Sequence, residues 1–187
     1  MNDHSWWLVS RAAGVVALLM IAAAVLMGLA LAAGFGGPPA RRRVLVVLHE
    51  HTAVTGMAAA GLHGVALLGD AWLKPSLTDL AIPFAGDYRP FFTGLGIVAG
   101  YLGLLLGVSF YTRRRIGAKR WRKLHRATPV VYVLALVHAL GAGSDAGTPW
   151  LRALLLATAL PAAGLLLARV ARRTPRPTRA PPRATGA

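Results

Sequence analysis

Residues 8–35 read LVSRAAGVVALLMIAAAVLMGLALAAGF, and after Arg11 no charged side chain occurs until Arg41. A helix needs about 20 apolar residues to cross a hydrocarbon layer of about 30 Å. The stretch is rich in Ala, Leu and Val, and it ends at the turn-forming residues Gly36-Gly37-Pro38-Pro39. It therefore predicts a membrane-spanning helix.

The composition of the whole chain agrees with a membrane location. Of its 187 residues, 56% are hydrophobic and 14% are charged, whereas about 25% are charged in a typical soluble domain. The net charge of +15 also occurs in nucleic-acid-binding proteins, but here the basic residues lie in short segments between apolar stretches. Membrane orientation and contact with anionic lipid explain that placement better than nucleic acid does. The chain has no Cys, which excludes disulfides, thiolate-bound metals and iron–sulfur clusters.

Further apolar stretches occupy residues 44–68, 91–111, 127–142 and 150–168. The stretch 127–142 is short for a span, so its helix must extend into residues 124–126. We expect an all-α, polytopic membrane helix bundle with five transmembrane helices and no soluble domain. The bundle would cover residues 8–168, between an exterior N-terminus (1–7) and a disordered basic cytoplasmic tail (169–187) that is rich in Arg, Pro, Thr and Ala.

The first stretch has a second interpretation, as a cleavable signal peptide, because Ala30-Leu31-Ala32 resembles a cleavage site. The stretch is long for that role. Cleavage would also leave Arg41, Arg42 and Arg43 outside the cell, against the positive-inside rule. A retained helix is therefore favoured.

Charge predicts the orientation of the bundle. Three segments are strongly basic: residues 41–43, residues 113–126 and the tail. The N-terminus, the loop 70–89 and the loop 144–149 are nearly neutral or acidic. Five spans place all three basic segments on one side, which must be the cytoplasmic side of the plasma membrane.

Histidines recur at matched depths on two of the predicted helices. His49 and His63 are 14 positions apart, which corresponds to about 21 Å of rise on one face. His125 and His138 are 13 positions apart, or about 19–20 Å. Because one span separates the two helices, they run parallel, with His49 and His125 near the cytoplasm. Ionisable residues inside spans are costly and usually functional.

Two levels of paired imidazoles are what two stacked haems would require. Neutral imidazole is a good axial ligand of haem iron, and two per iron leave no open position, which suits electron transfer. One feature fits poorly: a spacing of 13 turns the second side chain by about 140° on a straight helix. Pro129 lies between His125 and His138, and a kink there would change the phase.

Other polar residues are weaker candidates. His51 points away from His49 and is an alternative ligand of poorer phase, His4 is expected in solvent, and Glu50 is expected at the cytoplasmic interface. Arg11 could pair with a propionate of the outer haem or extend to the interface. Arg126 could do the same at the inner haem or serve in orientation alone. We expect no catalytic side chain, so the metal ligands are His49, His63, His125 and His138.

These residues resemble the ferric reductase-like transmembrane domain family, which includes ferric reductases, NADPH oxidases and the haem-binding subunit of a periplasmic methionine-sulfoxide reductase. The resemblance covers roughly residues 6–168. It rests on Trp7…Arg11…Gly14, Leu48-His49-Glu50-His51, Gly61-Leu62-His63, Asp70, Trp121-Arg122-Lys123-Leu124-His125-Arg126 and Leu136-Val137-His138-Ala139-Leu140-Gly141-Ala142-Gly143-Ser144-Asp145. It implies b-type haem, an inner one held by His49 and His125 and an outer one held by His63 and His138.

The chain also departs from that family, because many members have six helices and this sequence predicts five. It has no Gly-rich nucleotide-binding fingerprint, so we expect no flavin or nicotinamide domain within this sequence. As an oxidoreductase subunit it needs a donor, either a cytoplasmic flavoprotein or membrane quinol, and an exterior acceptor or reductase subunit. Two alternatives stay open: a version with a single haem, and a haem-free transporter or assembly protein that uses the histidines as a proton relay.

Overall fold

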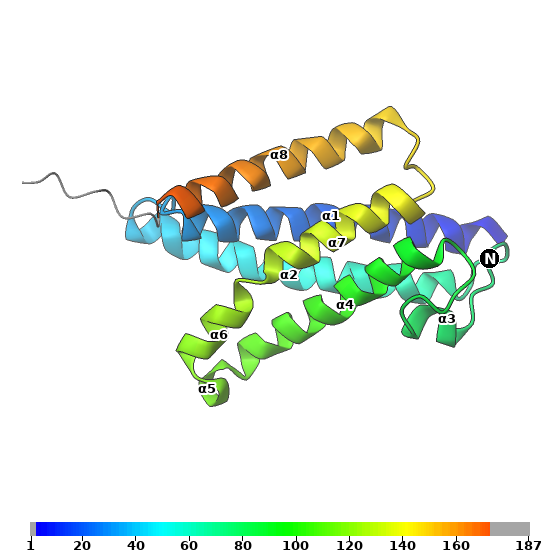
Figure 1. Ribbon diagram of the computed structural model, residues 1–187, viewed down its shortest axis with the longest axis horizontal. Coiled ribbons are helices and arrows are strands. Elements are labelled where there is room, and N and C mark those ends of the chain that lie inside the picture. Colours follow the sequence, from blue (N-terminus) through cyan, green and yellow to red (C-terminus); the bar gives the residue numbers. More distant parts are fainter. Residues whose placement is uncertain (1–2, 173–187) are drawn as a thin grey trace, which may run out of the picture.

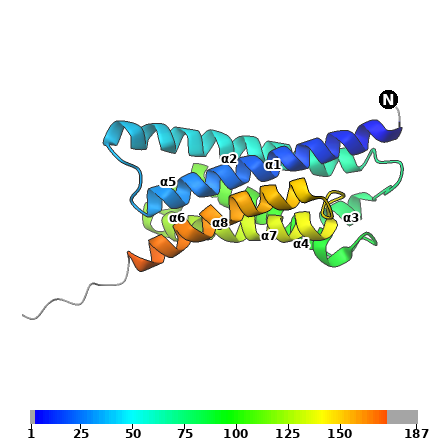
Figure 2. The ribbon, with the colours of Figure 1, turned by 90° about the horizontal axis from the view of Figure 1, so that it is seen from above.

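The computed structural model describes residues 3–172, and every regular element in that range is a helix. The bounds are α1 (Asp3–Ala32), α2 (Pro39–Leu67), α3 (Leu77–Ala81), α4 (Pro90–Tyr111), α5 (Arg113–Ile116), α6 (Ala118–His125), α7 (Thr128–Ala142) and α8 (Pro149–Ala171). The long helices lie side by side in an elongated bundle (Figures 1 and 2). The chain is thus all-α over its described length.

Proline explains where several helices begin. It occupies the first or second position of α2, α4, α7 and α8, as Pro39, Pro90, Pro129 and Pro149. An N–H at these positions has no partner within the helix, and the fixed φ of proline already suits it. The short α3 begins differently, with a capping box between Ser76 and Asp79. Hydrogen bonds from the backbone and side chain of Ser76 lower the pKa of Asp79.

Helix α1 lies at the centre of the packing. It packs along α2, to which it runs antiparallel, and it also contacts α7 and α8, while α4 and α7 form a second pair (Figure 1). The main core cluster joins α1 to α7 and α8 through Leu18, Ala22, Val25, Leu29, Tyr132, Leu151, Leu155 and Ala162. A smaller cluster of Ala99, Leu106 and Val131 joins α4 to α7.

Each predicted apolar stretch corresponds to a long helix, but among residues 3–172 four helices are long and apolar enough to span: α1, α4, the α6–α7 segment and α8. The predicted five-span count is therefore not established by hydropathy. The exception is α2, which has ample length, 29 residues. Its apolar residues are diluted by Arg41, Arg42, Arg43, His49, Glu50, His51 and His63.

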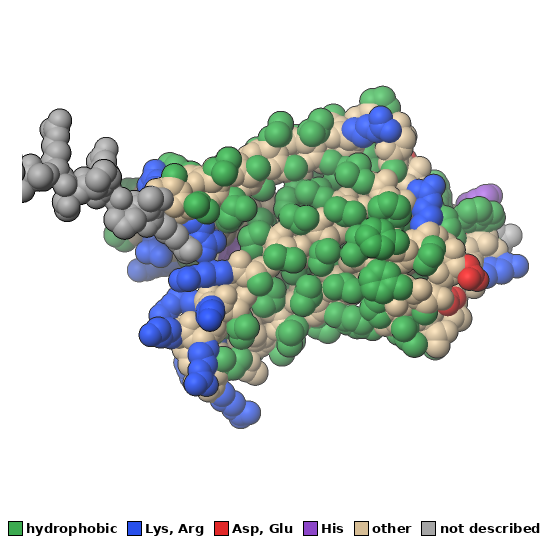
Figure 3. All heavy atoms as spheres, viewed as in Figure 1, with side chains coloured by type: hydrophobic (Ala, Val, Ile, Leu, Met, Phe, Trp, Pro, Cys, Tyr) green, Lys and Arg blue, Asp and Glu red, His purple; other side chains and the backbone are tan. Residues whose placement is uncertain are grey.

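Charge and hydropathy divide the surface as expected for a membrane protein. Lys and Arg gather most densely at the end formed by α5, α6 and the start of α2, acidic side chains appear together with some basic ones at the opposite end, and apolar side chains cover the flank between them (Figure 3). Large apolar residues of the long helices are well exposed, among them Leu105, Leu160 and Leu167. The predicted span 150–168 and the first residues of the predicted tail belong to one helix, α8, which continues to Ala171; residues 173–187 lie outside the described part.

Candidate functional site

Two pairs of histidines face each other between α2 and the α6–α7 segment, one at each level of the bundle. At the end that contains the N-terminus, His63 of α2 meets His138 of α7, with ring centroids 6.2 Å apart and planes inclined by 72°. At the basic end, His49 of α2 meets His125, the last residue of α6, with ring centroids 5.9 Å apart and planes inclined by 89°. The expected pairing by depth is therefore present. We call them the outer pair and the inner pair.

Backbone carbonyls on neighbouring helices hold three of the four imidazoles. The Nδ1 atoms of His49 and His63 lie 2.7 Å from the carbonyl oxygen of Ala24 and 2.8 Å from that of Ser10, both on α1. The Nδ1 atom of His138 lies 2.9 Å from the carbonyl oxygen of Phe92 on α4. A carbonyl only accepts, so each Nδ1 carries the proton and donates. Each Nε2 is then left with a free lone pair, the form in which imidazole binds metal.

His125 is held in a different way. Its ring stacks on Trp121 with centroids 5.0 Å apart. Within the described residues, its Nδ1 and the Nε1 of Trp121 are buried without a hydrogen-bond partner. The inner pair is therefore braced by one carbonyl and one aromatic face, whereas the outer pair is braced by two carbonyls.

The geometry of both pairs fits a metal ion placed between the rings. An imidazole nitrogen binds metal at about 2.0 Å, so two imidazoles on opposite sides of one ion have ring centroids about 6 Å apart. Among residues 3–172, no three His, Cys, Asp or Glu side chains gather into a metal-binding group. A metal at either pair would thus have two protein ligands, and a macrocycle such as porphyrin would supply the rest. Edge-to-face contact between aromatic rings gives similar distances, so the ligand role stays a prediction.

A helix break between His125 and His138 removes the phase problem seen in the sequence. Helix α6 ends at His125 and α7 begins at Thr128, so the two histidines do not share one straight helix. Pro129 has no N–H to offer the carbonyl of His125, and the hydroxyl of Thr128 donates to that oxygen instead, at 3.0 Å. The interruption falls at Arg126 and Ala127, before Pro129.

The remaining predicted residues lie around the pairs. Arg11 forms an ion pair with Asp145, which the sequence did not suggest, and Arg126 is exposed just after α6. His51 is exposed, and its Nδ1 contacts the carbonyl oxygen of Val47 on its own helix. His4 is exposed near the start of α1, and Glu50 is partly buried beside His49. The structure thus brings together His49 with His125 and His63 with His138, and leaves His51 and His4 out of both pairs.

A known protein family matches most of the segment that carries this geometry. The model of the ferric reductase-like transmembrane component family matches residues 13–136, about two thirds of the chain. The chain belongs to this family. No curated protein and no solved structure gave a match. The matched range contains three of the four paired histidines and stops two residues before His138. The contact of His63 with His138 in this ferric reductase-like chain is therefore seen in the structure and not in the family match.

Glycines beside the imidazoles are functional candidates that the sequence reasoning missed in this ferric reductase-like domain. A Cβ atom on Gly14 would lie 3.0 Å from the Nδ1 of His63, and one on Gly28 would lie 3.2 Å from the Cε1 of His49. Gly96 on α4 faces the ring of His138 in the same way. Gly14 and Gly28 are 14 positions apart, as His49 and His63 are. That equal spacing on two neighbouring helices was the signal that could have revealed them.

Proposed function

We propose that this protein is the membrane subunit of a reductase and carries electrons across the bilayer through two b-type haems. His49 and His125 would hold one haem, and His63 and His138 the other. The observation that carries the proposal is the pair of facing imidazole couples at two depths, three of whose rings direct Nδ1 to a carbonyl. A bound haem would supply an iron that accepts and releases one electron at a time.

The proposal includes α2 as a fifth span. Its 29 residues would extend about 43 Å as a helix, and it packs along α1, which is apolar enough to span. The Nδ1 atoms of His49 and His63 are directed to carbonyls of α1 rather than to lipid. Residues 8–35 would remain in the mature chain, because cleavage there would remove the carbonyls that hold both imidazoles.

The charge distribution supports an orientation in the plasma membrane with the N-terminus outside and the C-terminus in the cytoplasm. The basic end at α5 and α6 would then face the cytoplasm, beside the inner pair (Figure 3). A cytoplasmic flavoprotein or membrane quinol would donate electrons at that side, and an exterior acceptor or reductase subunit would receive them from the outer pair. Anionic lipid would contact the basic loops.

The decisive experiment is to purify the chain in detergent from haem-replete cells and to measure haem per protein. Two bis-histidine haems predict about two haems b per chain and the visible spectrum of low-spin cytochrome b after reduction. A colourless protein would exclude the proposal and favour the haem-free proton relay.

One observation favours the single-haem alternative. Both imidazoles of the outer pair have a carbonyl partner, whereas the Nδ1 of His125 in the inner pair has none in the described structure. Metal-bound imidazole usually donates its second N–H. A stoichiometry of one haem per chain, lost on replacement of His63 but retained on replacement of His125, would establish that alternative.

A further inference from the structure

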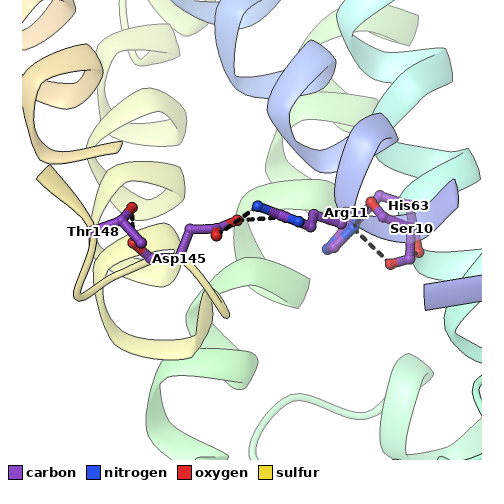
Figure 4. A network of polar contacts seen from close by, with 5 residues as sticks. All are labelled: Ser10, Arg11, His63, Asp145 and Thr148. Carbon is purple, nitrogen blue, oxygen red and sulfur yellow. Dashed lines mark hydrogen bonds and ion pairs between the residues drawn. The ribbon is translucent and has the colours of Figure 1, made fainter. Parts of the chain in front are cut away.

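The exterior end of the bundle contains a bidentate ion pair next to the outer histidines. Arg11 of α1 donates from Nε to Asp145 Oδ2 at 2.6 Å and from its terminal nitrogen to Oδ1 at 2.7 Å (Figure 4). The two side chains are 35% and 14% exposed. Such fork-to-fork pairs fix direction as well as distance. In a partly buried position, loss of either partner leaves an uncompensated charge.

On the Arg11 side of the ion pair, the neighbouring residue Ser10 contacts His63. Arg11 follows Ser10, whose side chain is only 2% exposed. The hydroxyl of Ser10 donates to the carbonyl of His63 at 3.0 Å and lies 3.0 Å from the Nδ1 of His63 (Figure 4). The Nδ1 of His63 in turn donates to the carbonyl of Ser10. The position of this turn of α1 therefore determines the position of the His63 ring.

The other end leads to His138. Asp145 lies just beyond the end of α7, the helix that carries His138. Thr148 stabilises this loop, because its hydroxyl and its N–H both donate to the carbonyl of Asp145, at 2.6 and 2.8 Å. Helices α2 and α7 are not among the helix pairs that pack extensively. Their separation at the outer level thus depends on the helices that hold each side: α1 holds His63, and α4 holds His138 through the carbonyl of Phe92. The Arg11–Asp145 ion pair adds a direct link from α1 to the end of α7.

We infer that the Arg11–Asp145 ion pair is a positioning device for the outer pair, which it sets at metal-binding distance by joining Ser10 and His63 to the end of α7. This inference rests on the proposed function, since the distance matters for a shared haem. It differs from the expectation that Arg11 pairs with a haem propionate, because here Asp145 is the partner of Arg11. The inner pair, held by Ala24 and Trp121, should not respond.

The first test uses haem signals. Arg11→Gln and Asp145→Asn should each shift the redox midpoint and the low-spin EPR signal of the outer haem, or lower haem content from about two towards one per chain, with the inner signal unchanged. The charge swap Arg11→Asp with Asp145→Arg should restore at least half of the loss. Asp87→Asn, an exposed acid at the same end, is the control. Equal changes in both haems, or a swap that rescues nothing, would overturn the inference.

The second test needs no haem. The chain has no Cys, so nitroxide labels can be placed at Val65→Cys on α2 and Leu140→Cys on α7, which are 64% and 49% exposed. Pulsed EPR should give a narrow distance distribution in the parent chain, a broader one in Arg11→Gln and Asp145→Asn, and a narrow one again in the charge swap. An unchanged distribution in both single variants refutes the positioning role. Absence of haem in the parent chain refutes the proposed function instead.

Discussion

His63 on α2 and His138 on α7 face each other with ring centroids 6.2 Å apart, although 75 positions separate them in the chain. Each ring donates its Nδ1 proton to a carbonyl on a third helix, α1 for His63 and α4 for His138. Two imidazoles are thus presented to one another without extensive packing of the helices that carry them. This relation is what the proposed redox role depends on most.

Replacement of the paired histidines should remove haems one at a time. His63→Ala or His138→Ala should lower the haem content from about two to about one per chain, because a bis-histidine iron loses an axial ligand. His49→Ala or His125→Ala should remove the other haem. The control is His51→Ala, since His51 is exposed and contacts only its own helix. Haem content measured as the pyridine adduct checks this, and unchanged content in all four variants would contradict the ligand assignment.

The glycines of α1 offer a test with two matched variants. Gly14→Ala would press a methyl group on the Nδ1 of His63 at 3.0 Å, and Gly28→Ala would press one on the Cε1 of His49 at 3.2 Å. Each ring must shift by a few tenths of an ångström, so Gly14→Ala should change the EPR signal of the outer haem and Gly28→Ala that of the inner haem. Gly164→Ala, where a Cβ meets nothing within 4 Å, should change neither. The same response in both α1 variants would argue against this pairing of glycine and histidine.

Pro129→Ala should affect the inner haem. The new N–H could donate to the carbonyl of His125, which would favour continuation of α6 into α7. On a continuous helix His125 would turn by about 140° relative to His138. We expect the inner haem to be lost or spectrally altered while the outer one is retained. Pro149→Ala, at the start of α8, is the control, and a normal inner spectrum in Pro129→Ala would show that other contacts hold the break.

The hydroxyl pair formed by buried Tyr132 and partly buried Thr158 should contribute to stability but not to haem binding. Tyr132 is 3% exposed and donates to the hydroxyl of Thr158 at 2.7 Å. Interhelical hydrogen bonds in membranes contribute about 0.6 kcal/mol on average, and an unsatisfied buried hydroxyl costs about 1–3 kcal/mol. Thr158→Val should therefore destabilise the chain more than Tyr132→Phe does, as measured by unfolding in mixed micelles. A destabilisation in the reverse order would mean that Tyr132 finds another acceptor.

Local patterns in the chain determined much of this picture. Hydropathy marked the positions of α1, α4, α7 and α8, because a span requires a long apolar run whatever its neighbours are. It also predicted the long helix α2, but it does not establish α2 as a span. Charge marked the basic end. The matched spacing of His49 to His63 and of His125 to His138 indicated two levels, because the rise of a helix depends only on the number of residues.

Only the tertiary structure decided which side chains face each other laterally. The rise of a helix gives depth, but its rotation and neighbours depend on packing among distant segments. Arg11 meets Asp145, 134 positions away, and Gly14 meets His63 on another helix. The orientation of His125 depends on the helix break after it, where the hydroxyl of Thr128 donates to the carbonyl of His125. No repeating spacing in the sequence marks such contacts, because they form between side chains of different helices once these have packed together.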